Sequence, residues 1–266
     1  MRRRNFFPSL LMAPTAARSA FASNTQEAAM AGREYYELRV YRMRRGPKVK
    51  MFNDFLRTAA LPAVKRNGIG PVGVFEVMIG PESPSLYLLM PYKSLDQLAA
   101  VSDRVAADAE YQKLGAEFIN LPATDPGYER AESSLMVAFE GMPKLQVPPA
   151  RSEGPPRIFE LRTYESHSRK ANKKKIEMFN TGEIKIFHRA GLQPIFFGET
   201  LIGPRLPNLT YMLAFDNMAA HDKAWDAFRT DPEWKKLSTT PGYGDAEIVS
   251  SISNTFLRPA PYSEIK

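Results

Sequence analysis

The chain has 266 residues, of which 44% are hydrophobic and 24% are charged, and its formal net charge is +7. This length allows one large or two ordinary domains, and the apolar content is that of a globular protein able to bury a core. The absence of cysteine excludes disulfides and thiolate metal sites.

The N-terminus resembles an export signal. The segment Arg3-Arg4-Asn5-Phe6-Phe7 is similar to the twin-arginine motif, and Ala20-Phe21-Ala22 offers the small-x-small pattern of signal cleavage. The apolar run between them is too short for a spanning helix of ~20 residues, so we expect no stable membrane insertion. We predict that residues 1–22 are removed near Ala22 and that the protein is bacterial and periplasmic or secreted. A basic tail and an organelle presequence are the alternatives.

Signal removal would also change the charge. Residues 1–22 hold four arginines and no acid, so the mature chain would carry +3 (7 − 4). A surplus of that size is ordinary for a soluble protein and gives little attraction to nucleic acid. The sequence also carries no nucleic-acid-binding motif, so we expect no nucleic-acid partner.

The first predicted domain, residues 33–141, has the order strand, helix, strand, strand, helix, strand. Alternating or β-branched runs predict the strands, and apolar residues at helical spacing predict the helices. The strands are Tyr35–Met43, Val72–Ile79, Leu86–Tyr92 and Ser134–Phe139, and the helices are Lys48–Arg66 and a stretch from Ser94 or Asp96 to about Ile119.

A proline-rich linker, residues 142–156, separates this domain from the second one, residues 157–260. Its five prolines cannot sustain regular structure and predict a semi-rigid spacer. The second domain repeats the order of the first. Its predicted elements are Ile158–Glu165, Lys173–Arg189, Ile195–Leu201, Leu209–Phe215, Met218–Leu237 and Ser250–Leu257.

The two domains are copies of one unit. Glu37 and Glu160 stand 123 positions apart, and the same offset relates Gly80 to Gly203 and Leu114 to Leu237. A constant offset over so many positions indicates a duplicated structural unit. Each unit has the βαββαβ order of a ferredoxin-like fold, in which two helices cover one sheet face. We therefore expect an α+β protein whose two sheets pack face to face as a barrel or sandwich.

These motifs resemble the NIPSNAP family. The resemblance rests on residues 36–41, 159–164 and 203–211 and on Trp225 with the segment Asp231-Pro232-Glu233-Trp234. It implies two tandem NIPSNAP domains packed within one chain as a dimeric α+β barrel. Eukaryotic members look like mitochondrial, non-enzymatic interaction proteins, whereas relatives on the same fold include small oxygenases, haem-degrading enzymes and isomerases, so the fold alone assigns no activity.

Charged residues alternate with apolar ones in the first strand of each unit. Because side chains alternate across a strand, Glu37, Arg39 and Tyr41 share one face, and Leu38 and Val40 share the other. We predict that the apolar face meets the helices and that the polar face points into the barrel. The candidate ligand-binding residues are Glu37, Arg39, Tyr41 and Glu76 in the first unit and Glu160, Arg162, Tyr164 and Glu199 in the second.

Charges inside a sheet are costly unless they are paired, so this row allows two interpretations. It forms either a Glu–Arg network that fixes the packing or a pocket for a small polar or anionic molecule, with the arginines as anion holders. The histidines, His167, His188 and His221, lack metal-ligand spacing, so we expect them in surface or structural roles. We predict no metal and no cofactor.

The leading hypothesis is an exported protein that binds a small molecule inside the barrel, with no assigned reaction. The alternatives are a non-catalytic interaction module with a structural Glu–Arg core and a cofactor-independent oxygenase or isomerase. Two chains could also associate further into a homo-oligomer. Unpaired Glu or Arg in a large lumen would favour the first and third hypotheses, and full pairing would favour the second.

Overall fold

The structure is a computed structural model that describes residues 32–151 and 153–266. The predicted export signal, residues 1–22, lies outside the described residues. Residues Arg33–Lys266 form one compact unit. In the described part of the chain, every helix is too short or too polar to cross a bilayer.

The first repeat follows the predicted order. Ser94 and Asp108 begin successive helices because their side chains accept hydrogen bonds from the backbone N–H groups of Gln97 and Tyr111. The elements are β1 (Tyr35–Arg42), α2 (Pro47–Phe55), the π-helical segment η1 (Leu56–Ala60), α3 (Leu61–Arg66), β2 (Gly73–Ile79), β3 (Ser85–Tyr92), α4 (Leu95–Ala106), α5 (Ala109–Ile119) and β4 (Arg130–Ala138).

The second repeat has the same architecture. Its π-helical segment lies 123 residues after that of the first repeat, so the widened turn is a feature of the duplicated unit. The elements are β5 (Ile158–Glu165), α6 (Arg169–Met178), η2 (Phe179–Glu183), α7 (Ile184–Ala190), β6 (Gln193–Ile202), β7 (Asn208–Phe215), α8 (Met218–Thr230), α9 (Pro232–Ser238), α10 (Asp245–Ile248) and β8 (Ser251–Pro259).

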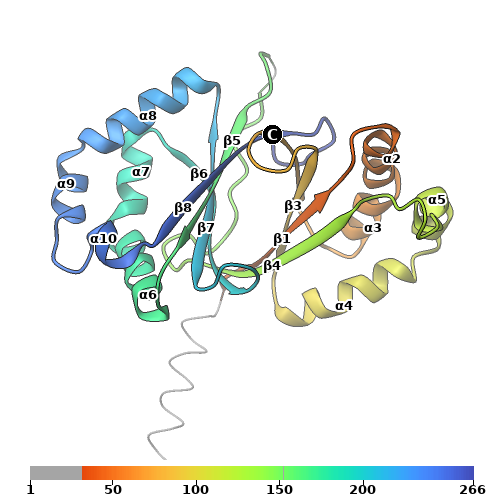
Figure 1. The fold of residues 1–266 in the computed structure, drawn as a ribbon, viewed down its shortest axis with the longest axis horizontal. Helices are drawn as coiled ribbons and strands as arrows, with labels where there is room; N and C mark the ends of the chain where they lie inside the picture. The colour runs from red at the N-terminus through yellow and green to blue at the C-terminus, as the bar shows by residue number, and fades with distance from the viewer. Residues whose placement is uncertain (1–31, 152) are drawn as a thin grey trace, which may run out of the picture. The chain divides into compact units, whose positions relative to one another are not determined.

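The strands of both repeats form one closed barrel in the order β1-β3-β2-β8-β5-β7-β6-β4. Two antiparallel pairings join the repeats: β2 pairs with β8, with Glu76 opposite Arg258, and β4 pairs with β6, with Val137 opposite Glu199. Figure 1 shows the strands in the middle, with α2–α5 on one side and α6–α10 on the other. Closure leaves neither sheet with an unpaired edge at these seams.

The three largest apolar clusters organise the core. One fills the barrel and draws on both repeats: Phe75 contacts Phe159 at 4.9 Å between ring centroids, and Tyr36 contacts Phe196 at 5.2 Å. The other two lie between a sheet and its own helices. The prediction that the two sheets pack against each other is therefore confirmed.

The linker is tied to both repeats although residues 143–151 and 153–157 form no helix or strand. The backbone N–H of Leu145 donates to the Glu34 carboxylate at 2.8 Å, and the N–H of Gln146 donates to the Ile195 carbonyl at 2.9 Å. Neighbouring side chains of the linker add ion pairs, such as that of Arg151 with Asp216 at 2.9 Å. The spacer thus adds contacts to the barrel beyond its covalent connection.

The boundaries differ from prediction in a few places. β4 begins at Arg130, four residues before the predicted start, because an exposed polar stretch continues the pairing with β1. Each long second helix divides at an aspartate, Asp108 or Asp231, whose side chain caps the helix that follows. The short helix α10 was not predicted.

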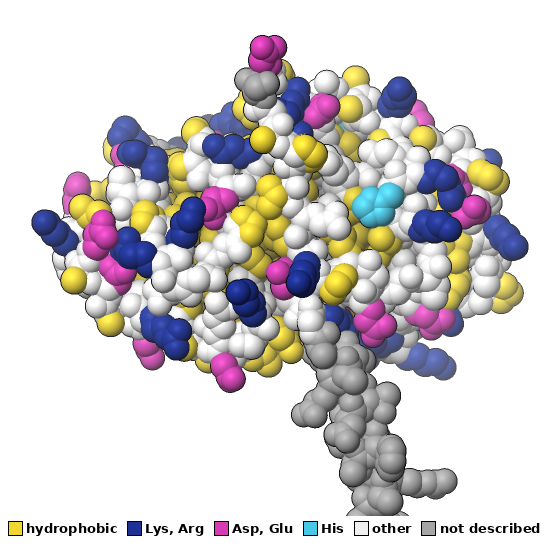
Figure 2. Space-filling model, turned by 180° about the vertical axis from the view of Figure 1, so that it is seen from behind, with side chains coloured by type: hydrophobic (Ala, Val, Ile, Leu, Met, Phe, Trp, Pro, Cys, Tyr) yellow, Lys and Arg dark blue, Asp and Glu magenta, His cyan; other side chains and the backbone are white. Residues whose placement is uncertain are grey.

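Charges of both signs are interspersed on the face shown in Figure 2. The duplication repeats one salt bridge: Arg66 pairs with Asp108 at 2.8 Å, and Arg189 pairs with Asp231 at 2.8 Å. Each bridge ties the end of one helix to the cap of another. Among its described residues this face presents no large field of one sign.

Candidate functional site

The predicted polar row points away from the barrel interior, so the predicted orientation of the strands was wrong. Leu38 and Leu161 belong to the cluster that fills the barrel, whereas Tyr41 and Tyr164 belong to the clusters beneath the helices. The candidate residues that face the helix side are Glu37, Arg39, Tyr41, Glu76, Glu160, Arg162, Tyr164 and Glu199.

In the first repeat the charged row forms a satisfied network. The Glu37 carboxylate accepts hydrogen bonds from Arg39 Nε at 2.8 Å, from the Tyr92 hydroxyl at 2.9 Å and from the Ser133 hydroxyl at 2.7 Å. Arg39 also donates to the Tyr41 hydroxyl at 3.3 Å. Burial, followed by the charge and hydrogen bond of Glu37, raises the pKa of Tyr92 above its usual range. Tyr92 therefore stays protonated and donates to Glu37.

The second repeat builds the same pair with different partners. Arg162 donates to Glu160 at 2.6 Å and to the Tyr164 hydroxyl at 3.2 Å. Trp225 of α8 donates its indole N–H to Glu160 at 2.9 Å, and the Arg162 guanidinium stacks 4.7 Å from the centroid of the same indole. His221 Nε2 lies 3.3 Å from Glu160 but outside hydrogen-bond geometry. Each carboxylate is thus held by donors from its own strand and from a neighbouring element.

The last two candidate glutamates, Glu76 and Glu199, also lie on the helix side, where Glu199 is buried. Glu76 pairs with Arg258 across the β2–β8 seam at 2.9 Å, and Glu199 pairs with Lys173 of α6 at 2.6 Å. All four candidate glutamates therefore have cationic partners. Their pairing supports the structural interpretation of the row, and a ligand-binding role for these residues stays a prediction.

A further buried ion pair occurs only in the second repeat. Lys175 and Glu183 are 1% and 2% exposed, and their charged atoms lie 3.2 Å apart. Lys175 also contacts Asp245 at 3.3 Å and the rings of Phe179 and Trp234. The equivalent positions of the first repeat are Phe52 and Ala60. Because the first repeat folds with apolar residues here, the fold does not require the charges.

Burial acts on both partners of this pair. It opposes the charged form of Lys175, but the carboxylates of Glu183 and Asp245 outweigh it and raise the Lys175 pKa. Burial also raises the pKa of Glu183, against the attraction of Lys175. The stabilisation from charged Lys175 is complete below its unfolded pKa of 10.5 and is lost as the pH rises through the higher folded pKa. Ionised Glu183 carries a desolvation cost at neutral pH.

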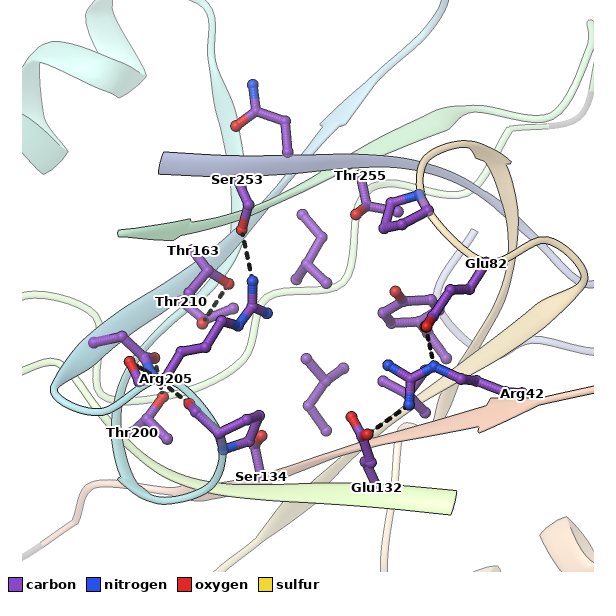
Figure 3. A pocket seen from close by; sticks show the side chains of 18 residues that line it. Arg42, Glu82, Glu132, Ser134, Thr163, Thr200, Arg205, Thr210, Ser253 and Thr255 are labelled. Carbon is purple, nitrogen blue, oxygen red and sulfur yellow. Dashed lines mark hydrogen bonds and ion pairs between the residues drawn. The ribbon is translucent and has the colours of Figure 1, made fainter. Parts of the chain in front are cut away.

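The barrel opens at one end into a cavity of about 440 Å³, shown in Figure 3. We call this cavity the barrel mouth. Its floor includes Leu38 and Leu161, which belong also to the apolar cluster inside the barrel. Its rim includes Glu82 and Arg205, which occupy equivalent positions in the β2–β3 and β6–β7 turns, each with φ 58. Both repeats are needed to form it.

The two sides of the barrel mouth differ in chemistry. On the side of the first repeat, Arg42 is paired with Glu82 and, at 2.6 Å, with Glu132. On the side of the second repeat, the Thr163 and Thr210 hydroxyls bond to each other at 2.9 Å. The duplication thus placed an ionic corner and a hydroxyl corner in one cavity.

Sequence analysis did not identify the barrel mouth. Its polar residues are dispersed over strand ends and turns, whereas the predicted site was based on residues that the repeats share. The available signal was in the differences: Val40 and Tyr87 of the first repeat correspond to Thr163 and Thr210 of the second. The described residues contain no group of His, Cys, Asp or Glu side chains that could hold a metal ion.

The closed barrel of two ferredoxin-like halves defines a dimeric α+β barrel contained in one polypeptide. The chain belongs to the NIPSNAP family, whose profile matches residues 36–136 and 159–264. The tandem-domain prediction is therefore confirmed. A comparison with proteins of curated function gives no match.

Solved structures of NIPSNAP proteins match about two fifths of this chain. A NIPSNAP-like domain protein from Burkholderia xenovorans is 19% identical, with a TM-score of 0.36, over 40% of this chain and 88% of its own. A NIPSNAP family protein of unknown function from Agrobacterium tumefaciens is 17% identical, with a TM-score of 0.37, over 41% of this chain and 94% of its own.

A candidate monooxygenase from Fusobacterium nucleatum is similar over both repeats. It is 7% identical, with a TM-score of 0.54, and the match covers 86% of this chain and 94% of that protein. At this identity the similarity shows a shared fold and carries no activity over to the present chain.

The buried pair leads to a prediction about stability. Glu183→Ala should lower the free energy of unfolding by about 3–5 kcal/mol, because it leaves Lys175 buried without its nearest carboxylate. The double variant Lys175→Phe/Glu183→Ala, which copies the first repeat, should recover most of that loss. Urea unfolding followed by circular dichroism measures both values. A double variant as unstable as Glu183→Ala would show that the charges are required for folding.

Proposed function

We propose that this protein binds a small polar molecule in the barrel mouth and that binding, without an assigned reaction, is its biochemical role. The observation that supports the proposal is the cavity of about 440 Å³ formed jointly by the two repeats. This size lies in the range of small-molecule sites, roughly 300–1,000 Å³. An apolar floor with a few polar groups at the rim is also typical of such sites.

The threonine hydroxyls of the hydroxyl corner indicate which functional groups a ligand would carry. Thr163 and Thr210 are 9% and 5% exposed and bond only to each other through their hydroxyls among the described residues. Each hydroxyl can both donate and accept, so the pair retains hydrogen-bonding capacity for a ligand. Thr200 extends the corner and donates to Asn208 at 2.6 Å. A molecule with hydroxyl or carboxylate groups fits this wall.

The Glu–Arg networks beneath the helices favour a structural role, as in a non-catalytic interaction module. They do not account for the barrel mouth, whose polar residues are a separate set on the other face of the strands. If this region served packing alone, side chains would fill it. The interior of the barrel is filled in that way by Phe75, Phe159 and Met212. Ligand binding therefore explains the cavity more directly than an interaction role does.

A paired substitution tests the binding site. Thr163→Val/Thr210→Val removes both hydroxyls but keeps the shape, so folding should be little affected. Small molecules retained by the purified protein should be identified by native mass spectrometry, and their affinity should fall about tenfold or more in the variant. Thr58→Val, an exposed threonine on η1, is the matched control. If the double variant retains the molecule as well as the parent protein and the Thr58→Val control do, the proposal is contradicted.

We further propose that residues 1–22 direct export of the chain and that the signal is then cleaved near Ala22. The support is the sequence pattern of residues 1–22, with its paired arginines and small-x-small site. In a bacterial host with a twin-arginine pathway, the intact mass of the periplasmic protein should correspond to a chain that begins at Ser23. Arg3→Lys/Arg4→Lys should retain the precursor inside the cell, while Arg18→Lys should not. Export of the double variant at the normal level would refute this route.

A further inference from the structure

The barrel mouth carries unused acceptors on one side and unused donors on the other. Of the described residues, four charged side chains line it: Arg42, Glu82, Glu132 and Arg205. Figure 3 places the first three together on one wall and Arg205 on the opposite wall. If the proposed function holds, this separation of charge indicates the class of molecule that the cavity binds.

The acidic wall has one cation for two carboxylates. Arg42 binds Glu82 through Nε and Glu132 through Nη1, and each contact uses one carboxylate oxygen. The second oxygen of each carboxylate has no hydrogen-bond partner among the described residues. Hydrogen bonds to both glutamates, the leading cause, raise the Arg42 pKa, so Arg42 stays charged. A net negative charge therefore remains at this wall and favours a cationic group.

Arg205 on the opposite wall is less fully engaged. Its Nη1 donates to the Ser253 hydroxyl at 3.3 Å and lies 3.7 Å from Glu165, beyond hydrogen-bond distance. Its Nε and Nη2 have no protein partner among the described residues. In Figure 3 the guanidinium is directed toward Ser253, which lies opposite Thr163 in the pairing of β5 with β8. Free guanidinium donors beside hydroxyls are suited to a carboxylate.

We infer that the barrel mouth binds a zwitterion whose ammonium and carboxylate lie at the two ends of a short carbon chain, with its carboxylate at Arg205 and its ammonium at the free oxygens of Glu82 and Glu132. The floor of Leu38 and Leu161 accommodates the carbon skeleton. A simple anion would leave the surplus charge of the acidic wall unmatched, and a simple amine would leave the Arg205 donors unused. A zwitterion matches both walls without changing the net charge of the site.

The duplication accounts for this arrangement. Glu82 and Arg205 are equivalent residues of opposite charge, separated by 123 positions. By strand register, Glu132 opposite Val40 corresponds to Ser253 opposite Thr163. Two identical repeats would have given two like walls. Divergence at these positions produced a polar axis across a cavity that would otherwise be symmetric.

Calorimetric titration with matched sets of probes tests the inference. Each set contains one unbranched ω-amino acid of about four to eight carbons, the corresponding ω-hydroxy acid, which lacks the ammonium, and the corresponding decarboxylated amine. At least one ω-amino acid should bind, and its two counterparts should bind about tenfold more weakly or worse, because each lacks one charge-assisted contact. Absence of binding by every ω-amino acid, or equal binding by a counterpart, would overturn the inference.

Two near-isosteric variants identify the walls. Glu132→Gln should weaken binding of the ω-amino acid about tenfold and leave binding of the ω-hydroxy acid unchanged. Arg205→Gln should weaken binding of the ω-amino acid and leave binding of the amine unchanged. Both side chains are about half exposed, so the fold should persist, which thermal unfolding without ligand verifies. An ω-amino acid that binds both variants as tightly as the parent would place the site elsewhere and refute the inference.

The two proposals can fail separately. If native mass spectrometry finds a retained molecule that depends on Thr163 and Thr210 but carries no ammonium, the binding function stands and the zwitterion inference falls. If the parent retains no molecule and binds no probe, both fall.

Discussion

The pairing of β2 with β8 and of β4 with β6 is the constraint on which the rest of the structure depends. These seams convert two open sheets into one closed barrel, which removes exposed edges and brings the inner faces of the repeats together. Each inner face alone would expose large aromatic residues such as Phe75 and Phe159 to water. Because one chain carries both repeats, closure needs no second copy. The barrel mouth exists only because the seams hold.

The two faces of the strands differ in the residues they carry and in what those residues contact. The outer face holds Glu37 and Glu160 in networks with tyrosine, tryptophan and arginine partners under the helices, where every carboxylate is paired. The inner face is largely apolar at its centre and polar where it lines the barrel mouth. In the second repeat the outer layer also buries Lys175 with Glu183, and the first repeat has apolar residues there. Divergence after duplication therefore changed both the helix layer and the mouth.

The fold could be predicted from the sequence because the repeat, with its 123-residue offset, makes every element appear twice. Which face of each strand points into the barrel could not be predicted, because both faces carry residues that can be buried. Tyr36 and Leu38 lie on one face, and Tyr41 lies on the other. Their partners decide the direction, and these come from distant helices. The site was missed for a related reason. Conserved pairs between repeats revealed the scaffold, whereas Glu82 and Arg205, which differ, line the cavity.

Cross-linking across one seam tests barrel closure most directly. The chain has no cysteine, so the variant Glu76→Cys/Arg258→Cys adds a single thiol pair at register partners of β2 and β8. Directly opposed residues in antiparallel strands lie about 4.5–5.5 Å apart, within the Cα separation of a disulfide. The account predicts rapid, near-complete intramolecular disulfide formation on mild oxidation, and little in the control Glu76→Cys/Ile252→Cys. Failure of the first pair to cross-link, or equal cross-linking of the control, would contradict the closed barrel.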